Sequence, residues 1–218
     1  MLMDADDCQL VLVDYQTRLM PVIFENERVI ANAVRLAHMA RIMQVPVWGT
    51  AQTPDKLGLN VPALQAAIEA AGGRTLDKAH FSAVADGLVD WLRPPARKVH
   101  SAAPARGNAR SLPKHMQRPQ QQQAQQTQDE EVGPNTLIIA GCEAHVCLLQ
   151  TALDLLEEEF EVWVVTDACS SRSERNRDAA FDRLAGNGAE LVTTEMVAFE
   201  WLRTAEHPAF RDVLAIVK

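Results

Sequence analysis

Apolar and polar residues alternate along the chain in blocks that predict buried strands and amphipathic helices in turn. Five short segments predict strands, and the first is a continuous apolar run of the kind that is covered on both faces. These expected strands are residues 8–14, 45–50, 135–141, 161–167 and 189–195. Apolar positions recur at helical spacing between them, and the longest expected helices are residues 26–44, 144–158 and 174–187. This order predicts an α/β fold, a three-layer open parallel sheet with helices on both faces.

Two weaker patterns lie in the middle of the chain. The stretch RTLDK at residues 74–78 predicts a short strand, and residues 84–93 predict another amphipathic helix. The complete pattern is that of a Rossmann-like sheet, in which the ligand crevice lies outside the carboxyl ends of the strands. Reactive side chains at strand ends are therefore the first candidates for chemistry.

Residues 95–134 interrupt this alternation. The segment is rich in Pro, Gln, Arg and Ala and has almost no large apolar side chains. Such a composition cannot bury enough surface to offset the entropy that is lost on ordering. We predict a largely disordered insertion without an assigned function, within a single domain that spans residues 1–218.

Composition and charge narrow the range of partners. The chain has 218 residues, 47% hydrophobic content and a net charge of −8, which suits one sizeable core. The acidic balance offers no basic surface for nucleic acid or anionic lipid. Apolar stretches all fall short of the about 20 residues that span a bilayer. We expect a cytoplasmic protein that binds neither nucleic acid nor membranes.

Three reactive side chains fall at or just after strand ends. Asp14 ends the first strand, Lys78 ends RTLDK, and Cys147 follows the strand at 135–141 within a first helical turn. A thiol near a helix N-terminus faces unpaired N–H groups, and a neighbouring ammonium also favours the thiolate. We therefore expect a depressed pKa for Cys147, with a carboxylate beside it to take the proton. Spacing alone also fits one more buried structural cysteine.

The sequence around these residues resembles the cysteine hydrolases of the isochorismatase-like superfamily. The matching stretches are LVLVDYQ, DKAHFSAV, AGCEAHVCLLQTALDL and VVTDACSSRSERNRDAAFDRLAGNGAELVTTE. The pattern of that superfamily is a strand-ending Asp, a Lys near an F-S pair, and G-x-x-x-x-x-C opening a helix. The likeness covers nearly the whole chain outside the insertion.

The resemblance implies a role for each matching residue. Asp14 would be the base, Lys78 the ammonium partner and Cys147 the nucleophile, so that Cys142 is not the nucleophile. It also implies a cis peptide bond between Cys142 and Glu143, a strained bond of the kind that aims backbone donors at a site. Members of the superfamily are commonly oligomers, and a homo-oligomer is expected here.

Neither a metal nor another cofactor is expected. Nicotinamidases of the superfamily carry an Asp-x-His motif after the second strand, but this chain has WGTAQTPDKLG there, without a histidine. The region instead resembles the T-E-Q-x-P-x-x-L-G segment of isochorismatase-domain proteins whose substrates are mostly unassigned. The acid of that segment is Ala51 in this chain, whereas Thr50 and Gln52 match.

Four further residues are candidates for substrate binding. The resemblance places Phe81 on the pocket wall, and Gln52 belongs to the matching segment after the second strand. His145 either lines the pocket beside the nucleophile or satisfies its own helix N-terminus. Gln16 either orients Asp14 or faces solvent.

Two functions fit these observations. The leading hypothesis is a metal-independent cysteine hydrolase that acts on a small amide-like or related C–N substrate through a covalent intermediate on Cys147. The alternative is a catalytically idle protein of the same fold that serves as a binding or scaffold module. The presence of Asp14, Lys78 and Cys147 together favours the hydrolase.

Overall fold

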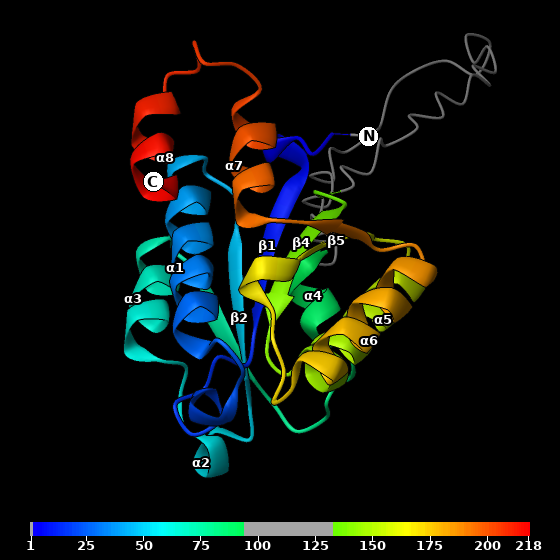
Figure 1. The fold of residues 1–218 in the computed structure, drawn as a ribbon. Helices are drawn as coiled ribbons and strands as arrows, with labels where there is room; N and C mark the ends of the chain where they lie inside the picture. The colour runs from blue at the N-terminus through cyan, green and yellow to red at the C-terminus, as the bar shows by residue number, and fades with distance from the viewer. Residues whose placement is uncertain (1, 94–132) are drawn as a thin grey trace, which may run out of the picture. The chain divides into compact units, whose positions relative to one another are not determined.

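A parallel sheet of six strands forms the centre of the structure, a computed structural model that describes residues 2–93 and 133–218 (Figure 1). The strands are β1 (Cys8–Val13), β2 (Val47–Gln52), β3 (Arg74–Lys78), β4 (Thr136–Gly141), β5 (Glu161–Val165) and β6 (Glu190–Val192). Their order in space is β3-β2-β1-β4-β5-β6. Residues 94–132, which hold nearly all of the expected insertion, lie outside the described residues, so that expectation stays a prediction.

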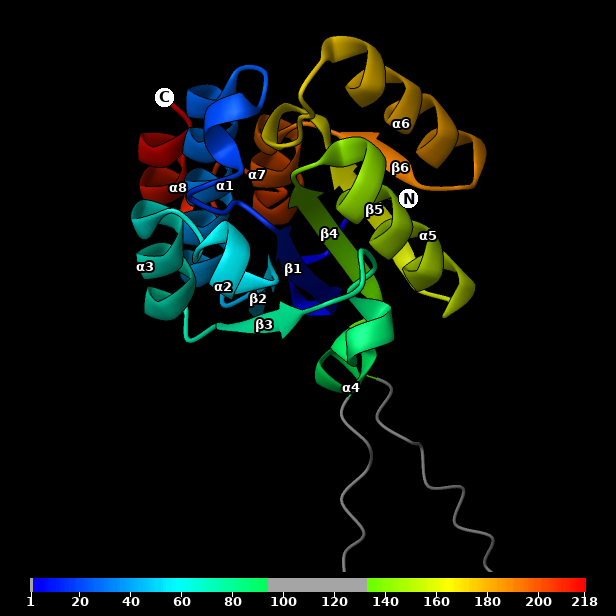
Figure 2. The ribbon, with the colours of Figure 1, turned by 90° about the horizontal axis from the view of Figure 1, so that it is seen from below.

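Helices cover both faces of this sheet, as the sequence predicted. The helices are α1 (Asn26–Ile42), α2 (Pro54–Leu57), α3 (Pro62–Ala70), α4 (Leu88–Leu92), α5 (Leu149–Glu157), α6 (Glu174–Gly186), α7 (Thr194–Leu202) and α8 (Phe210–Val217). Helices α1, α3, α7 and α8 pack on one face, and α4, α5 and α6 lie on the opposite side (Figures 1 and 2). The expected three-layer α/β fold is confirmed.

The strands β1 and β4 lie at the centre of the sheet because their sequences are almost continuously apolar. Every residue of β1 and of β4 is buried, because both faces of these strands are covered by helices. The two strands pair along their whole length, from Cys8 opposite Thr136 to Val13 opposite Gly141. Their common carboxyl end is therefore fixed by the densest part of the core.

Some element boundaries differ from those expected. The helix expected at residues 84–93 is divided into a short 3-10 helix, η3 (Val84–Asp86), and α4. Gly87 separates them with a φ of 91°, which is outside the helical region and suits glycine. The helix expected at 144–158 begins with one π-helical turn, η4 (Ala144–Leu148), before α5. Within the described ranges, no helix is both long and apolar enough to cross a membrane.

The order in which strands are added to the sheet reverses between β1 and β4. Strands β2 and β3 are added on one side of β1, and β5 and β6 are added beyond β4. At such a point the loops after the two central strands part toward opposite faces and leave a crevice at the carboxyl edge. Figure 2 views the molecule from this edge. Asp14 follows β1 and Cys147 follows β4, so both residues lie at this carboxyl edge.

Close packing between β1 and β4 can be tested at Gly141. A Cβ atom there would lie 2.6 Å from Cβ of Val13 and 2.7 Å from its carbonyl oxygen. We expect Gly141→Ala to lower the free energy of unfolding by about 2 kcal/mol, in the range typical of overpacked cores. Gly186→Ala is the control, because a Cβ at that position meets nothing within 4 Å. Urea denaturation should separate the two variants, and equal midpoints would contradict the close packing.

Candidate active site

Asp14 is the first residue after β1 and turns the chain away from the sheet. Its φ of 57° lies in the left-handed region, which aspartate tolerates better than most residues other than glycine. The side chain is buried, and Oδ1 accepts a hydrogen bond of 2.7 Å from Oγ1 of Thr50. A carboxylate in such a place needs a cation beside it to offset the loss of water.

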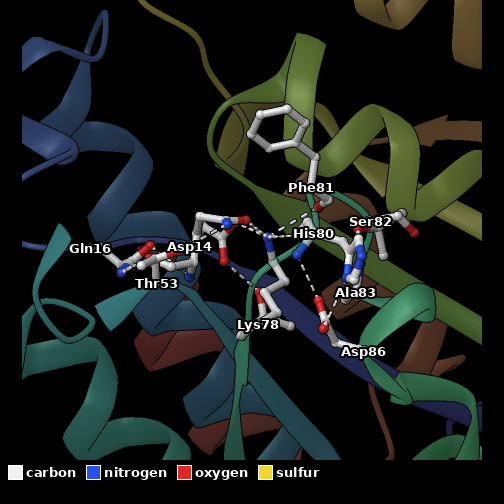
Figure 3. A network of polar contacts seen from close by, with 12 residues as sticks. Asp14, Gln16, Thr53, Lys78, His80, Phe81, Ser82, Ala83 and Asp86 are labelled. Carbon is white, nitrogen blue, oxygen red and sulfur yellow. Dashed lines mark hydrogen bonds and ion pairs between the residues drawn. The ribbon is translucent and has the colours of Figure 1, made fainter. Parts of the chain in front are cut away.

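Lys78 supplies that cation from the end of β3. Its Nζ lies 2.7 Å from Oδ2 of Asp14, and both side chains are 0% exposed. The ammonium also donates to Oε1 of Gln52 at 2.7 Å and to the carbonyl oxygens of His80 and Phe81 at 3.2 and 3.1 Å. Four acceptors thus surround a group with three protons. Figure 3 shows the ammonium between Asp14 and the loop after β3.

Cys147 lies at the same edge of the sheet, after β4. It lies in the π-helical turn after β4, a type of turn that often occurs at functional sites. The charges of Asp14 and Lys78 both act on its thiol, and the residue is 6% exposed. The three residues that the sequence singled out therefore meet in one place.

The protonation state of the thiol differs from the one expected from the sequence. The pKa of Cys147 is raised to about 12, first by burial and then by the charge of Asp14, while the charge of Lys78 lowers it. Desolvation was missing from the sequence argument, which considered only the helix N-terminus and the ammonium. At rest, the cysteine is a neutral thiol beside an ion pair.

The turn that leads to Cys147 contains the cis peptide bond between Cys142 and Glu143. The N–H of Cys142 donates to the carbonyl of Val13, and the N–H of Ala144 donates to that of Ser170. Within the described ranges, the N–H of Glu143 donates to no acceptor. Cys142 itself is buried, and burial raises the pKa of its thiol.

The side-chain amides of Gln16 and Gln52 form hydrogen bonds with other groups of the protein. Gln16 donates to the carbonyls of Gln52 and Gly58 and accepts from the N–H of Gln52. Gln52 accepts from Lys78 and donates to the carbonyl of Ala79. Both side chains are buried. Gln16 thus does not face solvent, and it reaches Asp14 only through Gln52 and Lys78.

The loop after β3 is held by Asp86. Its Oδ2 accepts hydrogen bonds from the N–H groups of Ala79 and His80, and Oδ1 lies 3.1 Å from Nδ1 of His80. Burial disfavours the charged carboxylate, but these N–H groups and the ring of His80 outweigh it and lower the pKa of Asp86. Phe81 is 53% exposed, and its ring points away from the ammonium of Lys78 (Figure 3).

His145 and Glu143 connect the turn after β4 to the segment that leads into α6. Nδ1 of His145 lies 2.9 Å from Oγ of Ser171, and Nε2 lies 3.3 Å from Nδ2 of Asn176. Glu143 pairs with Nε of Arg172 at 2.6 Å. The ring of His145 is thus held by a different segment and not by its own helix N-terminus.

Sequence reasoning missed two parts of this arrangement. Thr50 was noted only as one letter of a matching segment, although its hydroxyl bonds Asp14. Asp86 lies in the segment expected as a helix, residues 84–93, where its residue type and spacing give no signal of a role in the loop after β3. Thr50 lies 36 positions from Asp14, and Asp86 lies 7 and 6 positions from Ala79 and His80. These contacts depend on how the strand ends are placed.

No metal ligand set is formed by the described residues. Groups of three or more His, Cys, Asp or Glu side chains with suitable positions do not occur among them. All four cysteines of the chain are described, and all are free and buried.

Known proteins share both the sequence and the fold of this chain. The profile of the isochorismatase domain matches residues 8–196. Isochorismatase domain-containing protein 2 of Rattus norvegicus is 32% identical over 209 residues, which are 96% of this chain and 80% of that protein.

Two solved structures extend the comparison. The MAR1 ribonuclease of Caenorhabditis elegans superimposes with a TM-score of 0.78 and 28% identity, and covers 100% of this chain and 92% of its own. The YcaC gene product of Escherichia coli, described as an octameric hydrolase of unknown specificity, gives 0.72 and 24%, and covers 98% and 95%. The match to the domain profile and the similarity to the rat protein over almost the full length show that this chain belongs to the isochorismatase-like superfamily.

Proposed function

We propose that this protein is a hydrolase that cleaves a small amide or related C–N bond through a covalent intermediate on Cys147. Membership of the isochorismatase family supports a hydrolase in general terms. The observation that carries the more specific proposal is a buried pair of carboxylate and ammonium whose charges both act on one buried thiol. Together these groups provide a nucleophile, a base and a fixed positive charge.

The first half of the reaction forms a thioester. The sulfur of Cys147 adds to the carbonyl carbon while Asp14 accepts the thiol proton, so the raised thiol pKa is overcome only when the S–C bond forms. The negative charge on the substrate oxygen is stabilised by the N–H of Glu143, which has no acceptor among the described residues. The C–N bond then breaks, and the leaving nitrogen takes the proton from Asp14.

The second half releases the acid. Water gives a proton to Asp14 and adds to the thioester carbon, the C–S bond breaks, and the thiol recovers its proton. Lys78 keeps its ammonium throughout and stabilises both the carboxylate and the developing thiolate. The cycle requires no metal, and we expect activity to survive treatment with a chelator.

Other functions find less support. The similar structure from Caenorhabditis elegans is described as a ribonuclease, but the net charge of −8 disfavours binding of this chain to RNA. The idle scaffold has one observation in its favour, the raised pKa of Cys147. The scaffold hypothesis does not explain why a buried ion pair lies next to that thiol.

Replacement of the nucleophile tests the proposal directly. We expect the wild-type protein to hydrolyse at least one member of a panel of small amides and carbamates. Cys147→Ser should reduce the rate by at least about 10³-fold, as loss of a catalytic nucleophile does in other enzymes. Mass spectrometry of quenched wild-type reactions should find the acyl group on the peptide that contains Cys147.

Cys8→Ser is the matched control for this experiment. Cys8 is also a buried free cysteine, but it begins β1 at the opposite edge of the sheet. Its replacement should leave the rate per folded molecule unchanged. If no compound is turned over and no adduct forms on Cys147, the idle binding module becomes the better description.

The loop that surrounds Lys78 should depend on the charge of Asp86. We expect Asp86→Asn to lower the free energy of unfolding by about 1 kcal/mol at neutral pH, because two backbone N–H groups lose a charged acceptor. The folded pKa lies below the unfolded value of about 3.9, so the difference is complete above that pH and disappears as pH falls through the folded pKa. Thermal denaturation over this pH range measures it. Asp77→Asn, at an exposed position of β3, is the control and should leave stability at neutral pH nearly unchanged.

We also propose a homo-oligomer. Leu2, Met196 and Phe199 are exposed large apolar residues that line one hollow of about 430 Å³ along α7, and the similar Escherichia coli protein is described as octameric. Phe199→Glu should shift the mass measured by light scattering toward the monomer, because it places a charge in the contact. Val22→Glu, at an exposed apolar position after β1, should not. A wild-type protein of monomer mass would refute this proposal.

A further inference from the structure

Gln52 lies between Lys78 and Asp14, at the end of the strand over which the lysine side chain extends. Asp14 follows β1 and Lys78 ends β3, and β2 lies between those strands. Gln52 is the last residue of β2 and is paired in register with Lys78. The ammonium therefore passes over the end of β2 to reach the carboxylate, and the side chain of Gln52 meets it there.

The orientation of the Gln52 amide is fixed from both ends. Nε2 donates to the carbonyl of Ala79 at 2.6 Å and lies 3.2 Å from Oγ1 of Thr53. This leaves Oε1 to face the ammonium of Lys78, which it meets at 2.7 Å. The side chain is buried, so water cannot replace this acceptor without opening the site. An amide engaged in this way has no donor left for a substrate.

Gln16 fixes the backbone of Gln52 in turn. The ladder between β1 and β2 ends where Val13 faces Thr50, because Asp14 turns the chain out of the sheet. Beyond this point β1 has no residue to pair with Gln52, and the side-chain amide of Gln16 forms hydrogen bonds with the backbone of Gln52 instead. Its Oε1 accepts from the N–H of Gln52 and its Nε2 donates to the carbonyl of Gln52, both at 2.9 Å.

We propose that Gln52 is a positioning residue that sets the ammonium of Lys78 between Asp14 and the thiol of Cys147. It acts through Lys78 and does not bind substrate, in contrast to the role that the sequence suggested. The inference deepens the proposed function, on which it rests for the importance of the thiol. It also gives Gln16 a place, as the residue that holds Gln52.

The charge of Lys78 is the contribution that favours the thiolate of Cys147, against burial and the charge of Asp14. Gln52→Met keeps the length of the side chain and removes the acceptor. The ammonium then loses a buried hydrogen bond and moves toward its remaining partners, the carboxylate and the loop carbonyls. We expect the thiolate to form less readily as a result.

Alkylation of Cys147 by iodoacetamide measures this effect without any substrate. Labelled peptides of the full-length protein are quantified by mass spectrometry over the alkaline range below the thiol pKa. Gln52→Met should react about tenfold more slowly than wild type at each pH, as expected when a hydrogen bond to a charged group is lost. Lys78→Met sets the limit and should react more slowly still.

Gln9→Met is the matched control. Gln9 is also a buried glutamine whose amide binds backbone carbonyls, those of Leu92 and Pro134, and accepts from Trp48, but it lies in the first half of β1, away from the site. It should lose stability without slower labelling of Cys147. Wild-type rates in Gln52→Met, or equal slowing in Gln9→Met, would overturn the inference. Failure of the proposed function would instead appear as missing turnover in the wild-type protein.

Discussion

The ion pair between Asp14 and Lys78 is the interaction on which the rest of the site depends. Both side chains are fully buried, and removing two charges from water costs several kcal/mol each unless further hydrogen bonds compensate. The structure provides them through the hydroxyl of Thr50, the amide of Gln52 and two loop carbonyls. The polar residues around the crevice are understood most simply as the solvation shell of this pair.

The sheet topology makes such a pair possible. Three neighbouring strands contribute Asp14, Gln52 and Lys78 from their carboxyl ends, and the adjacent β4 leads into the turn with Cys147. Because these strands are parallel, their ends meet at one edge, and the reversal of strand order opens a crevice there. Residues far apart in sequence are thereby brought together at one edge of the sheet, and the turns after β1, β3 and β4 complete the site.

Burial of the thiol has a chemical consequence. A cysteine whose pKa is raised to about 12 is protected from indiscriminate oxidation and alkylation at neutral pH, because the thiolate is the reactive form. In the proposed mechanism, the carboxylate of Asp14 accepts the proton when an electrophile arrives. The arrangement thus favours proton transfer coupled to bond formation over a standing thiolate.

The sequence by itself determined the α/β architecture and, within a few residues, the strands and the longest helices, and its resemblance to a known superfamily singled out Asp14, Lys78 and Cys147. It could do so because continuous apolar runs, helical periodicity and strand-end positions are local features. Only the tertiary structure decided the protonation of Cys147, the engagement of the Gln16 and Gln52 amides, and the parts taken by Thr50 and Asp86. Desolvation and hydrogen-bond partners depend on which distant atoms surround a group, and one-dimensional order does not contain that information.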